Sequence, residues 1–171
     1  MKKRWIAIAL LTVLLMGIGG AIGKVGVRQE SDGSAYALYF VERDLRSADG
    51  RDALRSEERT LEDSGLSTEE LAAALVTELL KGPADPTLKS PFPKGTALLS
   101  AEQKGTELRV DLSAAYSTLS GVGLSLADYA ITLTLTQLPD VARVRITVAG
   151  RELDYRSRQV FLARDILTVP K

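Results

Sequence analysis

The chain has 171 residues, of which 45% are hydrophobic and 26% charged, and its 22 basic and 22 acidic residues give no net charge. This size suits one globular domain with an appendage. The chain contains no cysteine and no histidine, which excludes disulfides, thiolate nucleophiles, imidazole bases and zinc sites of the usual ligand types. Without cysteine, lipid attachment to a bacterial membrane is also excluded.

Charge is unevenly placed along the chain. Lys2, Lys3 and Arg4 are the only charged residues among the first 23, so residues 24–171 carry 19 basic and 22 acidic side chains. A nucleic-acid-binding protein needs a basic face to neutralise phosphates. This balance therefore argues against nucleic acid as a partner.

An uncharged apolar run of 18 residues, Trp5 to Ile22, follows the three basic residues. As a helix it would span about 27 Å, at ~1.5 Å per residue, close to the thickness of a hydrocarbon core. Residues 1–23 are therefore either an uncleaved transmembrane anchor or a secretory signal peptide cut near Ala21. The length of the run favours the anchor. Both alternatives place the C-terminal domain outside the cytoplasm, in the cell membrane or secreted.

Residues 24–35 lack hydrophobic periodicity and predict a linker. Tyr36–Val41 is an aromatic and β-branched run that predicts a buried strand, and a polar loop follows. Residues 53–61 predict a second short strand, which contains Arg59.

The best-defined element is a helix that begins after Ser67 and ends at Lys81. Ser67 and Glu70 form a capping-box pattern, in which the hydroxyl accepts a free N–H and the carboxylate accepts one in return. Apolar residues recur at helical spacing over residues 71–80. Gly82 can adopt the left-handed conformation that ends a helix, and Pro83 cannot continue it.

Three prolines predict an irregular connection over residues 84–95. Residues 96–103 and 107–112 predict two strands joined by a hairpin at Lys104–Gly105. A loop rich in glycine and serine, carrying Tyr116, is expected over residues 113–123.

Residues 125–138 leave two alternatives open. Apolar residues alternate with threonines over 131–136, which by period favours a strand. Ser125 with Asp128 instead imitates a capping box, and Pro139 would end a helix. Residues 141–148 alternate cleanly and predict a strand. Residues 151–171 form a polar tail whose apolar run at 160–162 either adds a final strand or stays loose.

Several short pieces, taken in order, resemble the GerMN domain of sporulation and spore germination proteins of Gram-positive bacteria. The pieces are Tyr39-Phe40, Arg59, Leu80-Lys-Gly-Pro83, Pro93-Lys-Gly-Thr96, Val110-Asp-Leu-Ser113, Thr134-Leu-Thr-Gln-Leu138 and Val148-Ala-Gly150. Each is weak alone, and their common order carries the resemblance, which covers residues 36–150.

The resemblance implies an α+β fold, a small mixed sheet with two helices on one face, similar to the ring-building motif of secretion proteins. It therefore implies a helix over residues 125–138. It also implies a set of structural motif residues: Arg59, Gly82, Pro83, Pro93, Gly95, Asp111, Ser113, Thr134, Gln137 and Gly150. This chain departs from the lipoprotein members by lacking the acylated cysteine, and from tandem members by carrying one domain copy.

Asp111 and Ser113 could be interpreted as a base and a nucleophile at a strand exit. A nucleophilic serine needs a positioned base and oxyanion donors, and the chain has no histidine. We therefore expect both side chains to hydrogen-bond the following turn. Arg59 could bind the carboxylate of a partner, but we expect it to pair internally with an acid such as Asp111, because its guanidinium binds carboxylates well in half-buried sites.

The sequence thus predicts a non-enzymatic domain without catalytic residue, metal or cofactor. Its expected role is protein–protein assembly in the bacterial cell envelope, in sporulation or spore germination, either by self-association or with another envelope protein. The alternative is a module that binds a cell-wall or other small envelope ligand, which would need a concave site with convergent polar groups.

Overall fold

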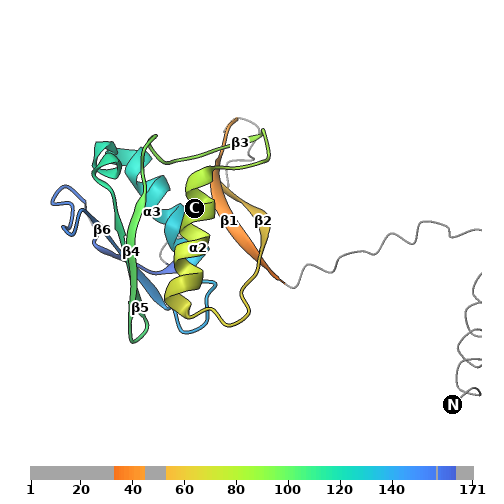
Figure 1. Ribbon diagram of the computed structural model, residues 1–171. Helices are drawn as coiled ribbons and strands as arrows, with labels where there is room; N and C mark the ends of the chain where they lie inside the picture. Colours follow the sequence, from red (N-terminus) through yellow and green to blue (C-terminus); the bar gives the residue numbers. More distant parts are fainter. Residues whose placement is uncertain (1–32, 45–52, 157, 165–171) are drawn as a thin grey trace, which may run out of the picture. The chain divides into compact units, whose positions relative to one another are not determined.

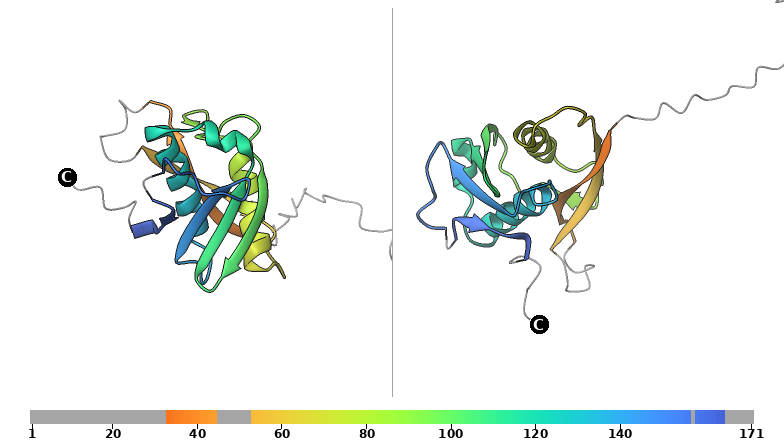
Figure 2. Two further views of the ribbon diagram at one scale, coloured as in Figure 1. Left: turned by 90° about the vertical axis from the view of Figure 1, so that its left-hand side faces the viewer. Right: turned by 90° about the horizontal axis from the view of Figure 1, so that it is seen from below.

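The computed structural model describes residues 33–44, 53–156 and 158–164, in which two helices lie between two sheets (Figure 1, Figure 2). The strands are β1 (Ser34–Glu42), β2 (Leu54–Leu61), β3 (Leu88–Lys89), β4 (Leu98–Lys104), β5 (Glu107–Leu112), β6 (Arg143–Val148) and β7 (Val160–Phe161). The helices are α2 (Thr68–Lys81), α3 (Gly121–Leu135) and the short 3-10 helix η1 (Ala114–Thr118).

The predicted α+β class is confirmed, but the single mixed sheet is wrong. The strands form two sheets, in the orders β2-β1-β3 and β4-β5-β6-β7. Helix α2 contacts β1 and β4, and α3 contacts β1 and β6, so each helix packs against both sheets rather than on one face. Alternation along a strand identifies its buried face but not the strand to which it bonds, which is why the sequence did not separate the sheets.

The first sheet is built around β1. It pairs antiparallel with β2 over its whole length, from Ser34↔Leu61 to Val41↔Leu54, and with β3 only at its last two residues. Strand β1 begins two residues before the predicted strand. Strand β3 lies in the predicted irregular connection and was not predicted.

The second sheet contains the predicted hairpin, since β4 and β5 are antiparallel around Gly105. Strands β5 and β6 then pair in parallel, which requires a long crossover connection between them. Helices η1 and α3 form that crossover. The last strand, β7, pairs antiparallel with β6, so the described part of the predicted tail adds a final strand.

Helix α2 has the predicted boundaries. Ser67 Oγ accepts the Glu70 N–H at 3.2 Å, and the Glu70 carboxylate accepts the Ser67 N–H at 2.8 Å. Gly82 ends the helix with φ = 90° and donates its N–H to the Leu79 carbonyl. Its ψ of 175° lies outside the left-handed helical region, although the positive φ still favours glycine.

Helix α3 is a helix, as the resemblance implied, but it begins at Gly121, and the capping box read at Ser125 is wrong. The Ser125 hydroxyl bonds the Gly121 carbonyl within the helix, and Asp128 is buried. Two of the three threonines that imitate a strand, Thr132 and Thr134, are buried as well, and Thr132 donates its hydroxyl to the Asp128 carbonyl at 2.8 Å. A threonine whose hydroxyl bonds a backbone carbonyl of its own helix can be buried in the core. The alternation of threonines with apolar residues therefore did not mark a solvent-exposed face.

The predicted loop after β5 is partly helical. Residues 114–118 form η1, which places the Tyr116 side chain inside the domain with no exposed surface. Its ring stacks on Phe92 at a centroid distance of 6.5 Å. The Gly- and Ser-rich composition indicated a loop, but it did not show that one large side chain in this segment, Tyr116, is buried.

Side chains at the end of α3 cover the edge of β1 that faces away from β2. The Gln137 amide accepts the Ala37 N–H at 2.9 Å and donates to the Ala37 carbonyl at 2.8 Å. One step along the strand, the Thr134 hydroxyl accepts the Tyr39 N–H at 3.2 Å. These side chains thus supply bonds that a neighbouring strand would otherwise make.

Several predictions lie outside the described residues: the anchor or signal at 1–23, the linker up to residue 32 and most of the polar loop before β2. Within the described ranges, no helix combines the length and apolar character needed to cross a membrane.

We expect Gln137→Ala to lower the free energy of unfolding by about 1 kcal/mol, because it removes the two hydrogen bonds to the Ala37 N–H and carbonyl. Urea unfolding followed by circular dichroism measures the change. Gln103→Ala is the matched control, since its amide is likewise exposed but bonds only the Gly105 and Asp140 carbonyls of two turns and no strand edge, and it should cost only a few tenths of a kcal/mol. Equal losses for both variants would contradict the role of Gln137.

Candidate functional site

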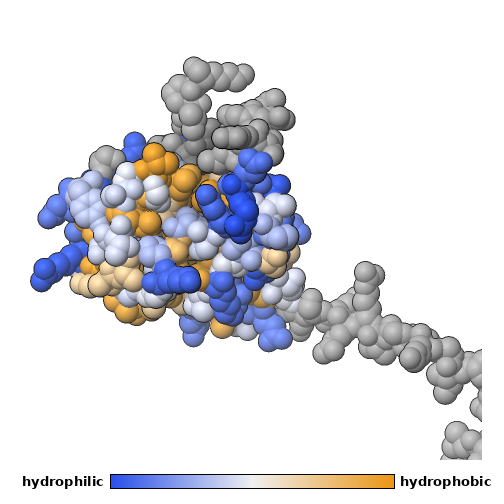
Figure 3. All heavy atoms as spheres, turned by 90° about the horizontal axis from the view of Figure 1, so that it is seen from above, coloured by the Kyte–Doolittle hydropathy of each residue, from blue (hydrophilic) through white to orange (hydrophobic). Residues whose placement is uncertain are grey.

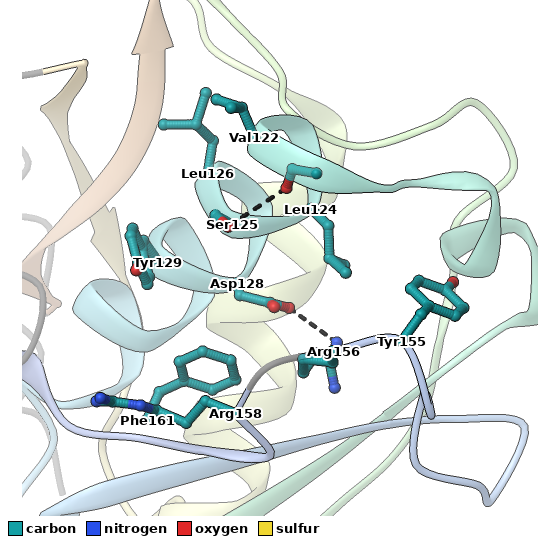
Figure 4. A pocket seen from close by; sticks show the side chains of 11 residues that line it. Val122, Leu124, Ser125, Leu126, Asp128, Tyr129, Tyr155, Arg156, Arg158 and Phe161 are labelled. Carbon is teal, nitrogen blue, oxygen red and sulfur yellow. Dashed lines mark hydrogen bonds and ion pairs between the residues drawn. The ribbon is translucent and has the colours of Figure 1, made fainter.

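The first half of α3 and residues 155, 156, 158 and 161 line a pocket of ≈ 590 Å³ (Figure 4). Its largest lining side chains are Val122, Leu124, Leu126 and Tyr129 from α3, and Tyr155, Arg156, Arg158 and Phe161 from the C-terminal segment. Val122 is 75% exposed and Tyr155 is 55% exposed. The pocket is therefore mainly apolar and aromatic, with a rim open to solvent.

A buried polar cluster forms one wall of this pocket. Asp128 Oδ1 accepts hydrogen bonds from the Tyr116 hydroxyl at 2.7 Å and from Arg156 Nη2 at 2.9 Å. The side chains of Asp128 and Arg156 are each 2% exposed. Burial raises the pKa of Asp128 to about 6, although Arg156 and Tyr116 both act to lower it. Burial, followed by the nearby Asp128 charge, raises the pKa of Tyr116 well above its usual value.

Arg156 connects this cluster to two further elements. Its Nη1 donates to the Ile146 carbonyl of β6 at 2.7 Å, and its guanidinium lies 5.7 Å from the centre of the Phe161 ring. Its Nε is buried and makes no hydrogen bond to the described residues. One side chain thus joins α3, β6 and β7.

The cluster has one property of a catalytic site and lacks others. A buried carboxyl with a pKa near neutrality is a common general acid or base. Here, however, Asp128 Oδ1 is already bound by two donors, and the Ser125 hydroxyl in the lining donates to the Gly121 carbonyl. The arrangement fixes α3 to the C-terminal segment and leaves an apolar pocket beside it.

None of the predicted site residues lines this pocket, and Asp111 holds a turn elsewhere in the domain. Asp111 Oδ1 accepts the Thr147 hydroxyl at 2.7 Å and the Gly150 N–H at 2.8 Å. Gly150 has φ = 76°, so the Asp111 carboxylate fixes the turn after β6 rather than the turn that follows it in sequence.

Ser113 holds a different turn, the one before β4. Its hydroxyl accepts the Ala97 N–H at 3.0 Å and donates to the Gly95 carbonyl at 3.1 Å. Pro93 lies in the same turn, where its carbonyl accepts the Thr96 N–H and hydroxyl. The Ser113 hydroxyl therefore acts as both donor and acceptor within the fold, and Asp111 is not its hydrogen-bond partner.

Arg59 pairs internally, as expected, but its partner is not Asp111. Its Nε donates to Glu57 at 2.6 Å, its Nη2 donates to the Gly82 carbonyl at 3.1 Å, and Glu78 lies 3.5 Å from Nη1. Glu57 also accepts the N–H groups of residues 84 and 85. Burial acts to raise the pKa of Glu57, but these N–H groups and Arg59 together lower it. The network ties the Gly82-Pro83 turn to β2.

The sequence analysis missed Asp128, Tyr116 and Arg156 as one cluster. One signal was present: Asp128 lies among Leu124, Ala127 and Ile131 at helical spacing, on an apolar face. An acid in that position needs a buried partner. Nothing in the sequence identified Arg156, 28 residues away, as that partner.

In the part of the chain that the structure describes, no group of three or more acidic side chains is placed to hold a metal ion. The chain supplies no histidine or cysteine ligand either.

The pKa of Asp128 predicts a stability change between pH 5 and 7. In the folded state the Asp128 carboxyl keeps its proton up to about pH 6, whereas in the unfolded state it has lost that proton by pH 5. Because the folded state binds the proton more tightly, raising the pH destabilises the fold. We expect the unfolding free energy to fall by about 1 kcal/mol over this range. The chain has no histidine that would titrate in the same pH range. The other carboxyl groups with shifted pKa values have lowered ones, so they titrate below this range.

Asp128→Asn should abolish this slope, because asparagine does not titrate. Urea unfolding at pH 5, 6 and 7, followed by circular dichroism, measures both proteins. A wild-type stability that stays constant or rises over this range would contradict the assignment.

Comparison with known proteins identifies the fold. The tandem GerMN domains of the sporulation protein GerM from Bacillus subtilis match with a TM-score of 0.57 and 20% identity, over 76% of this chain and 44% of that chain. This chain thus spans less than half of that tandem structure. The first GerMN domain of the same protein matches with a TM-score of 0.53 and 17% identity, over 70% of this chain and 86% of that chain.

A candidate lipoprotein from Clostridium perfringens has the same fold. It matches with a TM-score of 0.52 and 23% identity, over 78% of this chain and 89% of that chain. No curated protein sequence matches this chain. The model of the Germane family, described as sporulation and spore germination, matches residues 37–154, which is more than half of the chain. The chain therefore belongs to the Germane family and carries a GerMN-type domain.

Proposed function

We propose that this chain is a non-enzymatic domain that assembles proteins in the bacterial cell envelope during sporulation or spore germination. The family match over residues 37–154 is the observation that carries the proposal. The likeness to the domains of a sporulation protein supports it at the level of the fold.

The roles of the polar residues support an assembly role over catalysis. Asp111 and Ser113, the two side chains that suggested a base and a nucleophile, each bind a separate turn. Asp128, whose pKa lies near neutrality, is 1% exposed and is bound by Tyr116 and Arg156. In each case the side chain makes bonds that stabilise the fold.

An extracytoplasmic location follows from the sequence in this proposal. Trp5 to Ile22 is apolar and uncharged and comes after three basic residues, a pattern that keeps the N-terminus in the cytoplasm. The domain from residue 34 onward would then lie on the outer side of the membrane. If the apolar run is retained, the chain would cross the membrane once. Partner proteins in this reading are envelope proteins or further copies of the chain.

Deletion of residues 34–164 in the source bacterium, with residues 1–33 retained, tests the role. We expect a lower yield of heat-resistant spores or slower germination, and restoration by the full chain. Asp111→Asn serves as the control for catalysis. If this variant still folds, it should restore the phenotype, because in this proposal Asp111 only holds a turn. Normal sporulation and germination in the deletion strain would overturn the proposal.

The pocket beside α3 favours a second candidate, a module that binds a small envelope ligand. It is concave and aromatic and has two arginines in its lining, features common to ligand sites. Soluble cell-wall fragments should then shift the nuclear magnetic resonances of residues 121–129, and Val122→Lys at the rim should weaken binding at least tenfold. Unchanged resonances at millimolar fragment concentration would exclude cell-wall fragments as the ligand.

A further inference from the structure

The edges of the two sheets differ in how their backbone groups are covered. An uncovered strand edge is a template for pairing with another chain, and proteins usually protect such edges. In this domain β1 is covered by β3 together with Gln137 and Thr134, β4 carries a bulge between Leu98 and Ser100, and β7 has only two residues. Of the described strands, β2 is the one whose outer edge is long, regular and without these protections.

The register of β2 shows which backbone groups face outward. The Glu42 N–H donates to the Ala53 carbonyl, so odd-numbered residues of β2 bond β1 and even-numbered residues face away. Within the described residues, no hydrogen bond reaches the backbone groups of Ser56, Glu58 or Thr60. The strand lies at the outer side of the domain in Figure 1 and in the right-hand view of Figure 2.

We propose that β2 pairs antiparallel with β2 of a second copy of this chain, which would join the two small sheets into one of six strands. This inference rests on the proposed assembly function and names its surface and partner. The pairing is centred on Glu58, which aligns residues 55–61, seven of the eight residues of the strand. It places Ser56 opposite Thr60 of the second copy and forms about six backbone hydrogen bonds.

Charge complementarity favours a second copy over an unrelated strand. The side chains of Arg55, Glu57 and Arg59 alternate in sign along the inner face of β2. In the proposed register, each Glu57 lies opposite Arg59 of the second copy; since these two side chains already pair within their own chain, the two internal pairs would join into one network of alternating charge. Glu58 lies directly opposite Glu58 at the twofold axis, and Glu57 and Arg59 each lie diagonal to the same residue of the second copy.

Backbone pairing also fits the face of the domain that is seen from above in Figure 3. On the face shown in Figure 3, apolar residues lie in small groups divided by charged ones. A stable interface through apolar burial needs a larger continuous patch. Pairing of strand edges needs no such patch, because main-chain hydrogen bonds supply the contacts.

Single cysteines test the register directly, because the natural chain has none. The full chain, purified in a non-ionic detergent, is oxidised and examined on a non-reducing gel. Glu58→Cys should give a cross-linked dimer, since paired Cα atoms at the axis lie about 5.5 Å apart, within disulfide range. Ser56→Cys alone should not, because its two thiols lie about 13 Å apart. A mixture of Ser56→Cys with Thr60→Cys should cross-link.

Solution mass across a concentration series measures the association itself. Ser56→Pro removes an outward N–H and should weaken dimerisation at least tenfold, whereas the matched Ser56→Ala keeps the N–H and should not. Glu58→Gln removes the like-charge contact at the twofold axis and should tighten the dimer. Circular dichroism confirms that each variant is folded, and the cysteine results hold independently of the proline variant.

Two results would overturn the inference: a monomer at every concentration, or a dimer that Glu58→Cys does not cross-link and Ser56→Pro does not weaken. Both are distinguishable from failure of the proposed function. If deletion of the domain still impairs sporulation or germination, assembly with a different protein or through another surface stands, and only the pairing of β2 is lost.

Discussion

Helices α2 and α3 each pack against both sheets, and the rest of the domain depends on this placement. A helix between two sheets has little surface left for solvent, so its polar side chains must find partners inside the protein. In α3, Thr132 bonds its own helix, Thr134 bonds β1 and Asp128 bonds Tyr116 and Arg156. These bonds allow a helix with several polar residues to occupy the core.

The same requirement extends to the backbone. Two sheets of three and four strands have four edges, and each edge exposes donors and acceptors. The domain covers one of them with a glutamine side chain that bonds both backbone groups of Ala37. It fixes its turns in a similar way, with Asp111, Ser113 and Glu57 each accepting backbone N–H groups from a different loop. Much of the polar chemistry of the chain is therefore used to complete the fold.

How much the sequence predicted depended on how local each feature is. Helix α2 was predicted to the residue because its cap, apolar face and stop signal lie within one stretch. The hairpin of β4 and β5 and the strand β6 were predicted for the same reason. Periodicity alone did not resolve α3, because its buried threonines look like the solvated positions of a strand.

Features that depend on distant pairing could not be predicted. The division into two sheets, the strand β3 and the parallel pairing of β5 with β6 are set by contacts between remote residues. For the same reason the pairing of Asp128 with Arg156 was missed, and Arg59 was given the wrong acidic partner. Single side chains could be identified as polar and half-buried, but the sequence did not show which of them meet.

The bond between Asp128 and Arg156 also determines where the domain ends. The family match ends at residue 154, two residues before Arg156. A chain shortened to that limit would keep Asp128 and Tyr116 in the core but lose the cation and the Phe161 ring beside it. Removing one member of a buried ion pair typically costs about 3–5 kcal/mol, a large part of the stability of a small domain. The folding unit therefore extends at least to Phe161, beyond the limit that sequence similarity sets.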